Sequence, residues 1–230
     1  MLSPFSIDYR PPFLLAEFAE PQRLLSWSLN KPGFRIASRV VWIEVRNADL
    51  PPDIKPERLL AERLAAANLS DAIALVTSRD LSRYTVSEAS VEGHMATCVA
   101  TVGLSNGEWV GKRFAEAAHF GTINTLVHVS SPLSKAALVE VISMATAART
   151  TAILDAGIQR NGVAITGTGT DCIVVASPAR GRRERFAGMH MAVGEAVGAA
   201  VYRTIHDGAN VWRADFEAML QSTQSAERVE

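Results

Sequence analysis

The sequence predicts a single α+β domain in which a mixed, largely antiparallel sheet packs against long apolar helices. Its 230 residues have a globular composition, with 48% hydrophobic and 20% charged side chains, which excludes a mainly disordered chain. Several strand-like runs follow one another without helices between them, and this favours antiparallel or mixed pairing over a Rossmann alternation. Two long helix-like segments are rich in alanine, valine and leucine, as expected for helices that cover a sheet.

The first 34 residues have a weak pattern and are punctuated by five prolines. We expect them to form an extended arm on the core, with one short helix or strand near residues 22–29. Residues 35–45 are rich in β-branched side chains and predict a strand. After a loop over 47–55, residues 57–68 combine strong helix formers with an apolar stripe, and Pro56 suits the first helical turn.

Further strands are predicted from runs of apolar and β-branched residues. Residues 72–77 are continuously apolar and predict a central strand, whereas 84–92 alternate between apolar and polar side chains. Residues 95–104 and 120–129 have the same β-rich character. Residues 163–177 predict two short strands around a turn of glycine and threonine.

Two long helices are predicted in the second half of the chain. The first runs from 132 to 155, with Ser131 as its candidate N-cap. The second covers 189–219, with a break expected at the Asp207-Gly208 pair. Residues 221–230 are polar and predict a frayed tail, so the main domain is expected to span residues 35–220.

Charge and cysteine content exclude several functional classes. The net charge of -1 argues against a protein that binds nucleic acid through phosphate contacts. No run of about 18 apolar residues predicts a membrane span, and the N-terminus lacks a basic signal region. Cys98 and Cys172 form no metal or redox motif and predict buried thiols in a reducing compartment. We therefore expect a cytoplasmic protein.

Three clusters of small polar residues interrupt apolar strands and are candidates for a binding site. Glycines let a ligand approach the backbone, and adjacent hydroxyls and amides supply directed hydrogen bonds. The alternative is that each cluster is a turn that satisfies its own backbone. The candidate substrate contacts are Ser105, Asn106, Gly121, Thr122, Thr166, Gly167, Thr168, Gly169 and Thr170.

Two residues are candidates for acid–base chemistry. Asp171 borders the third cluster and has the chemistry of a general base, although an Asx turn cap is the alternative. His190 lies before a helix, where the helix dipole favours a neutral imidazole. His119 is the second choice among the histidines, and none of them has metal-ligand spacing. The basic run over 180–185 has the chemistry to bind an anion, or forms a solvated loop.

Five motifs in order resemble those of the adenosylcobinamide amidohydrolases, corrinoid-remodelling enzymes of the CbiZ type. The resemblance covers roughly residues 35–206. The motifs are Val102-Gly103-Leu104-Ser105-Asn106, Gly121-Thr122-Ile123-Asn124, Pro132-Leu133-Ser134, Thr166-Gly167-Thr168-Gly169-Thr170-Asp171, and Ala187-Gly188 with His190 followed by Val193-Gly194 and Val197-Gly198.

The resemblance implies hydrolysis of the amide that joins the aminopropanol arm to the corrin ring acid, yielding adenosylcobyric acid. The corrinoid would be the substrate, with no protein-bound metal or cofactor. On this reading Asp171 or His190 acts as the base, and Asn106, Asn124 and the backbone of 166–170 stabilise the oxyanion.

The chain departs from the resembled pattern at two points. Residues 40–44 contain no glycine pair, and the helix signature contains Ala148 and Arg149 where the family has an acid and a lysine. Arg149 keeps the positive charge and is a further candidate substrate contact. These departures leave two alternatives open: a protein that binds a corrinoid or another cofactor such as a pterin without turnover, and a hydrolase for a different amide.

The two predicted helices also suggest self-association. Residues 134–154 and 193–205 are apolar and rich in small side chains, which permits close packing against a second copy of the chain. Packing on the chain's own sheet is the alternative. We expect a homo-oligomer.

Overall fold

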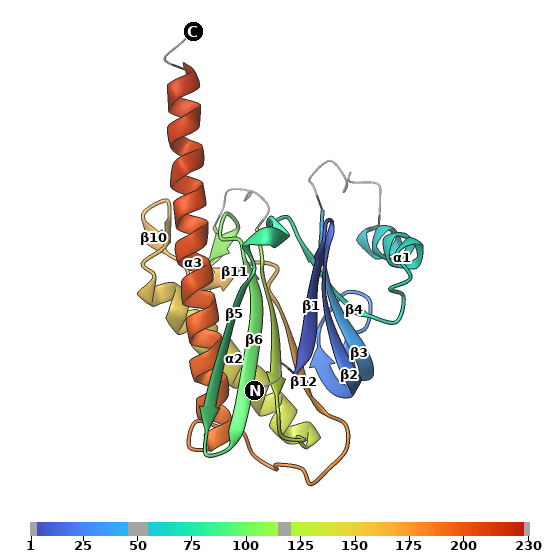
Figure 1. Cartoon of the computed structure of the whole chain (residues 1–230). Coiled ribbons are helices and arrows are strands. Elements are labelled where there is room, and N and C mark those ends of the chain that lie inside the picture. Colours follow the sequence, from blue (N-terminus) through green and yellow to red (C-terminus); the bar gives the residue numbers. More distant parts are fainter. Residues whose placement is uncertain (1–3, 46–54, 115–120, 228–230) are drawn as a thin grey trace.

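An eight-stranded mixed sheet forms the centre of the computed structural model, which describes residues 4–45, 55–114 and 121–227 (Figure 1). The strand order is β4-β3-β2-β12-β8-β6-β5, and β1 pairs with β2. Five pairings are antiparallel, and the β3–β4 and β8–β12 pairings are parallel. The strands are β1 (Phe5–Arg10), β2 (Phe13–Ser26), β3 (Gly33–Glu44), β4 (Ile73–Thr77), β5 (Thr85–Val91), β6 (His94–Val102), β8 (Ile123–Val129) and β12 (Cys172–Pro178).

Helices cover this sheet at two places. The helices α2 (Lys135–Asp155) and α3 (Ala192–Glu227) pack on each other and share one apolar cluster with β6, β8 and β12. The short helix α1 (Pro56–Ala66) buries Leu60 and Leu64 against β3 and β4. This arrangement confirms the predicted class, an α+β domain with a mixed, largely antiparallel sheet.

The opposite face of the sheet is buried because the sheet curls over itself. A register shift between Glu17 and Gln22 marks an irregularity in β2, and such bulges increase strand twist. The curl encloses a second apolar cluster that joins Trp42 of β3 to Leu126 of β8 and Val174 of β12. It also brings β4 close to β8, so that the two sides of the curled sheet frame a cleft.

The N-terminal segment differs most from the sequence prediction. Residues 5–26, expected as an arm with one short element, form two strands of the main sheet. The prolines obscured this pattern, yet Pro11 and Pro12 lie in the turn between β1 and β2, and Pro21 lies at the register shift. At these three positions no backbone N–H is needed for regular pairing between strands. Strands tolerate proline at such positions.

The long helices depart from the prediction at three points. The N-cap of α2 is Ser134, whose hydroxyl accepts a hydrogen bond from the Ala137 N–H at 3.1 Å, and not Ser131. The helix α3 continues through Gly208 and through residues 221–227 instead of breaking and fraying. A Cβ on Gly208 would lie 2.6 Å from a methyl group of Val102, so this glycine allows close packing of the helix on β6.

Other predicted segments are confirmed in part. β4 lies at the end of the strand order rather than at its centre, although α1 and the curl of the sheet keep it buried. Residues 163–177 contain the short strands β10 (Val163–Ala164) and β11 (Gly167–Thr168) before β12 begins. Residues 47–54 of the loop predicted over 47–55 lie outside the described residues, as do His119 and Phe120.

Of the described helices, α2 has the length and composition to cross a bilayer. Its buried side chains, which include Leu138, Val141 and Ile153, belong to the cluster shared with the sheet and α3. A core helix of this kind passes the same test of length and apolarity.

Candidate functional site

A cleft of about 450 Å³ lies between α1, the ends of β3 and β4, and the segments that lead into β8 and β12. Its volume falls within the ~300–1,000 Å³ range of small-molecule sites. Apolar side chains of α1 and β3, including Leu59, Leu60 and Ile43, form much of the lining. The polar lining side chains are Ser28, Arg63, Thr77, Ser78, Thr122, Asn124, Thr170 and Asp171.

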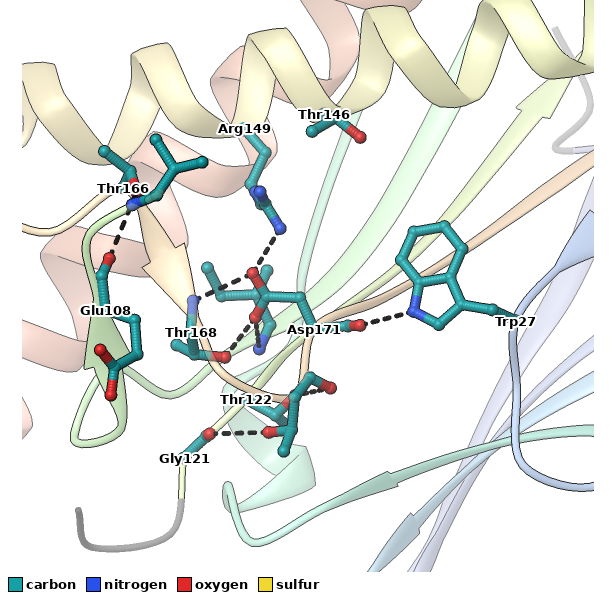
Figure 2. Close-up of polar contacts among 12 residues, drawn as sticks. Trp27, Glu108, Gly121, Thr122, Thr146, Arg149, Thr166, Thr168 and Asp171 are labelled. Carbon is teal, nitrogen blue, oxygen red and sulfur yellow. Dashed lines mark hydrogen bonds and ion pairs between the residues drawn. The ribbon is translucent and has the colours of Figure 1, made fainter. Parts of the chain in front are cut away.

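The structure brings the three predicted clusters of small polar residues together beside this cleft. The Thr122 hydroxyl donates to the Thr170 carbonyl at 2.9 Å, and the Thr170 hydroxyl donates to the Gly121 carbonyl at 3.3 Å (Figure 2). The Gly169 N–H donates to the Asn106 carbonyl at 3.3 Å. The three clusters therefore form hydrogen bonds with one another, although they are distant in sequence. They are not three independent turns that each satisfy their own backbone.

Gly121 allows the closest of these approaches. A Cβ at this position would lie 3.0 Å from backbone atoms of Gly103, Ser105 and Asn106. Backbone atoms cannot move aside as a flexible side chain can, so the site requires a glycine. The first and second clusters are packed against each other at this residue.

The Asp171 carboxylate is the centre of the polar network next to the cleft (Figure 2). It accepts hydrogen bonds from the Ile123 N–H and the Thr168 N–H, each at 3.0 Å, and from the Thr168 hydroxyl. The Arg149 guanidinium forms an ion pair with it. These donors fix the loop over 167–170 onto β8, so the carboxylate as it stands orders the cleft's edge. The Asp171 carboxylate could act as a base only if one of these donors moved away from it.

Arg149 reaches Asp171 from α2 (Figure 2) and is not among the residues that line the cleft. The Arg149 side chain is 14% exposed and the Asp171 side chain 6% exposed. Gly167 makes room for the pair, because a Cβ there would lie 2.8 Å from the carboxylate and 3.2 Å from the guanidinium. The arginine predicted as a substrate contact thus binds the predicted base.

Asn124 lines the cleft and joins its two sides. Its side-chain amide donates to the Val76 carbonyl of β4 at 2.7 Å, and its backbone carbonyl accepts from the Trp42 indole N–H at 3.4 Å. The residue is 1% exposed. It therefore ties β8 to β4 across the curl of the sheet.

The other predicted contacts divide into two groups. Gly121, Thr122, Gly169 and Thr170 line the cleft with Asn124 and Asp171. The remaining residues lie outside the cleft lining, and all of them except Ser105 contribute to the network around Asp171 or lie at the pairing of β11 with β7 (Gly107–Glu108). The Thr166 hydroxyl, for example, accepts from the Val110 N–H at 2.8 Å and donates to the Glu108 carbonyl at 3.2 Å. This second group is Ser105, Asn106, Thr166, Gly167, Thr168 and Arg149.

His190 lies at the other end of the sheet. It precedes α3 in the segment that leaves β12 at Pro178, whereas the cleft lies where β12 begins at Cys172. Its side chain is exposed. His190 and Asp171 are therefore not brought together, and His119 lies outside the described residues.

Among the described residues that line the cleft, only Arg63, Asp171 and Cys172 carry titratable side chains. Burial raises the pKa of the Cys172 thiol to about 12, so this residue supplies no thiolate near neutral pH. No group of three or more His, Cys, Asp or Glu side chains in the described part of the chain is placed to hold a metal ion.

The family model for adenosylcobinamide amidohydrolase matches residues 3–216. The chain belongs to the adenosylcobinamide amidohydrolase family. No curated protein matches it. The match to the family model also covers the N-terminal strands β1 and β2, which lie before the residues that carry the motif resemblance.

Two solved structures show distant likeness to this family member. The PH0078 protein from Pyrococcus horikoshii OT3 has 11% sequence identity and a TM-score of 0.45, with 90% of this chain and 79% of that chain covered. The L-aminopeptidase D-Ala-esterase/amidase from Ochrobactrum anthropi, described as a variant of the Ntn hydrolase fold, has 12% identity and a TM-score of 0.38. That comparison covers 89% of this chain and 82% of the other.

The structure adds one prominent residue that sequence reasoning missed in this amidohydrolase family member. Trp27 lines the cleft, is 47% exposed, and donates its indole N–H to the Asp171 backbone carbonyl at 2.8 Å (Figure 2). The hydrogen bond fixes the indole beside the loop over 167–170. Its only signal in the sequence is a tryptophan at the end of a strand-like run, within a segment predicted to be an arm.

Proposed function

We propose that the protein hydrolyses adenosylcobinamide at the amide that joins the aminopropanol arm to the corrin ring acid. A water oxygen bonds to the carbonyl carbon and the C–N bond breaks. The released nitrogen takes up a proton, which gives aminopropanol and adenosylcobyric acid. The family match over residues 3–216 carries this proposal.

The cleft supports the proposal because its chemistry suits a neutral amide beside a large apolar group. Its polar lining side chains are mostly hydroxyls and an amide, which bind an uncharged arm without requiring a counter-ion. The exposed Trp27 and Leu29, at 47% and 52%, offer apolar surface at the cleft. A cleft of this size accommodates the amide arm and the adjoining ring edge, so the rest of the macrocycle would lie outside it against these side chains.

We assign the chemical roles by position relative to the cleft. Asn124 retains a second amide hydrogen after donating to Val76, and this hydrogen is a candidate oxyanion donor. Asp171 is the candidate base if Arg149 or Thr168 releases it. A base role for His190 would require chemistry at the other end of the sheet.

The test is incubation of the purified protein with adenosylcobinamide. Mass spectrometry would detect adenosylcobyric acid, and the visible spectrum of the corrin would report binding. We expect product from the native chain, no product from Asn124→Ala or Asp171→Asn, and native turnover from Asp71→Asn, whose carboxylate lies outside the cleft lining. Loss of product in His190→Gln alone would contradict the assignment of the cleft.

One observation favours a second candidate function, corrinoid binding without turnover. The described lining offers no unengaged acid or base, because Asp171 already has four donors around its carboxylate. A spectral change without product would support this candidate. If neither product nor a spectral change is observed, the ligand is a different amide substrate or a cofactor of another class, such as a pterin.

We further propose that the protein is cytoplasmic and forms a homo-oligomer, with the corrinoid as substrate rather than as a bound cofactor. Support for self-association comes from α2, on which Val139 is 53% exposed and Leu154 is 42% exposed. These exposed apolar side chains are available for contact with a second copy of the chain. Light scattering of the purified chain would test this, and a monomer would contradict it.

A further inference from the structure

The end of the sheet opposite the cleft carries a concentration of positive charge. Residues 180–191, in the connection between β12 and α3, contain four arginines and one glutamate, whereas the whole chain has a net charge of -1. The four arginines are exposed. Lys135, exposed at the start of α2, lies at the same end of the fold (Figure 1).

Large apolar side chains are exposed among these charges. Phe186 is 55% exposed, Met189 is 71% exposed and Met191 is 39% exposed. Ile36 of β3, at 61%, belongs to the same surface, because it pairs with Arg23 of β2, which pairs with Ser177 at the end of β12. We call this surface the basic end and define it as Phe34, Ile36, Lys135 and residues 180–191.

The basic end is a structured surface. The Ser134 N–H donates to the Glu184 carbonyl at 2.9 Å, and the Glu184 N–H donates to the Pro132 carbonyl at 2.8 Å. The Glu140 carboxylate accepts from the Ala187 N–H. These bonds attach the backbone of the connection to α2 and to the residues before it, on both sides of Arg185.

Charged and apolar groups alternate closely on this surface. The Arg185 guanidinium lies 5.6 Å from the centroid of the Phe186 ring, and the Lys135 ammonium lies 5.4 Å from that of Phe34. Both long helices begin here, α2 at Lys135 and α3 at Ala192. Their N-terminal dipoles add to the positive potential of the arginines.

We infer that the basic end binds the surface of a lipid bilayer that contains anionic lipids. Arginine and lysine are attracted to anionic headgroups, and exposed phenylalanine and methionine side chains enter the boundary between headgroups and acyl chains. Charge alone would equally suit a nucleic acid, but phosphate contacts give no reason for exposed apolar side chains beside the arginines. This inference is independent of the proposed reaction, and it describes peripheral binding rather than a span.

The test is co-sedimentation of the full chain with lipid vesicles. We expect binding to vesicles of equimolar phosphatidylcholine and phosphatidylglycerol at low salt, weaker binding at high salt, and little binding to phosphatidylcholine alone. The paired substitutions Arg182→Gln and Arg183→Gln should weaken binding roughly 30-fold, at ~1 kcal/mol for each charge. The paired substitutions Phe186→Ser and Met189→Ser should also weaken it, at unchanged charge.

The matched control removes two exposed arginines elsewhere, Arg10 and Arg58, whose side chains are 82% and 81% exposed. Arg10→Gln with Arg58→Gln should retain native binding, and circular dichroism should confirm that every variant is folded. Equal loss in this control would indicate nonspecific charge attraction and overturn the inference. Absence of vesicle binding would also overturn the inference. So would a Phe186→Ser, Met189→Ser variant that binds vesicles as the native chain does and still binds a DNA duplex.

Discussion

The cleft and the basic end lie at opposite ends of the same strand, β12, and use polar residues in opposite ways. Beside the cleft, the Asp171 charge is paired with Arg149, and the Thr122 and Thr170 hydroxyls donate to backbone carbonyls. At the basic end, four arginines stay exposed beside apolar side chains. The first arrangement neutralises the Asp171 carboxylate within the protein and favours a largely neutral ligand. The second arrangement offers charge to a large partner.

The largest expected effect tests whether the paired charge holds the cleft together. Asp171→Asn leaves the Arg149 guanidinium, 14% exposed, without its counter-charge, and this should lower the free energy of unfolding by about 3–5 kcal/mol. Urea denaturation would measure the loss. Asp71→Asn, which breaks an exposed pair with Arg39, should cost about 0–1 kcal/mol. Similar losses of stability in Asp171→Asn and Asp71→Asn would show that the buried pair contributes no more than the exposed one.

The next effect concerns His128, in the strand β8 that runs between the two ends. Burial lowers its pKa from 6.5 to about 4, and its Nδ1 has no hydrogen-bond partner among the described residues. Below pH 6.5 the unfolded chain therefore takes up a proton that the folded chain refuses. Stability should be complete above pH 6.5 and fall by about 3 kcal/mol as the pH approaches 4.

Chemical denaturation of the native chain and of His128→Leu across this pH range would measure that contribution. The difference in pH dependence between the two proteins isolates His128 from the carboxylates, which also titrate at low pH. Parallel curves for the native chain and His128→Leu would contradict the prediction.

A smaller effect tests the packing of α3 beneath the basic end. A Cβ on Gly194 would lie 2.1 Å from the Gly188 carbonyl oxygen, so Gly194→Ala should cost about 2 kcal/mol of stability and weaken vesicle binding. Gly198, one turn later, has only the Met144 methyl at 3.9 Å. Gly198→Ala should therefore gain about 0.5–1 kcal/mol from helix propensity. Thermal unfolding compares the two, and destabilisation by both would argue against the packing of α3.

The smallest effect concerns ligand binding at the cleft. Trp27→Ala removes an exposed ring and should weaken cobinamide binding about tenfold, the scale of an aromatic contact. Absorbance titration of the corrin would measure this. Trp27→Phe keeps a ring but loses the 2.8 Å bond to Asp171, which separates contact area from positioning. Trp109→Ala, at a residue that is 38% exposed and outside the cleft lining, is the control and should bind normally.

Local chemistry in the sequence was sufficient to predict much of the site. The glycine and threonine clusters stand out because small polar residues interrupt apolar strands, and they do converge. Their partners could not be predicted, because Arg149 and Asp171 are 22 residues apart and meet only when α2 packs on the sheet. Trp27 was missed for a related reason, since its place beside Asp171 depends on the pairing of β2 with β12.

The sequence by itself determined the fold class, the positions of most strands and helices, and the family, because these depend on periodicity and on short motifs. Only the tertiary structure decided that the first strands belong to the sheet and that its curl forms the cleft. It also decided that Asp171 is paired and that His190 lies away from the cleft. Each of these depends on contacts between distant segments, and the geometry of such contacts is fixed by packing rather than by local preference.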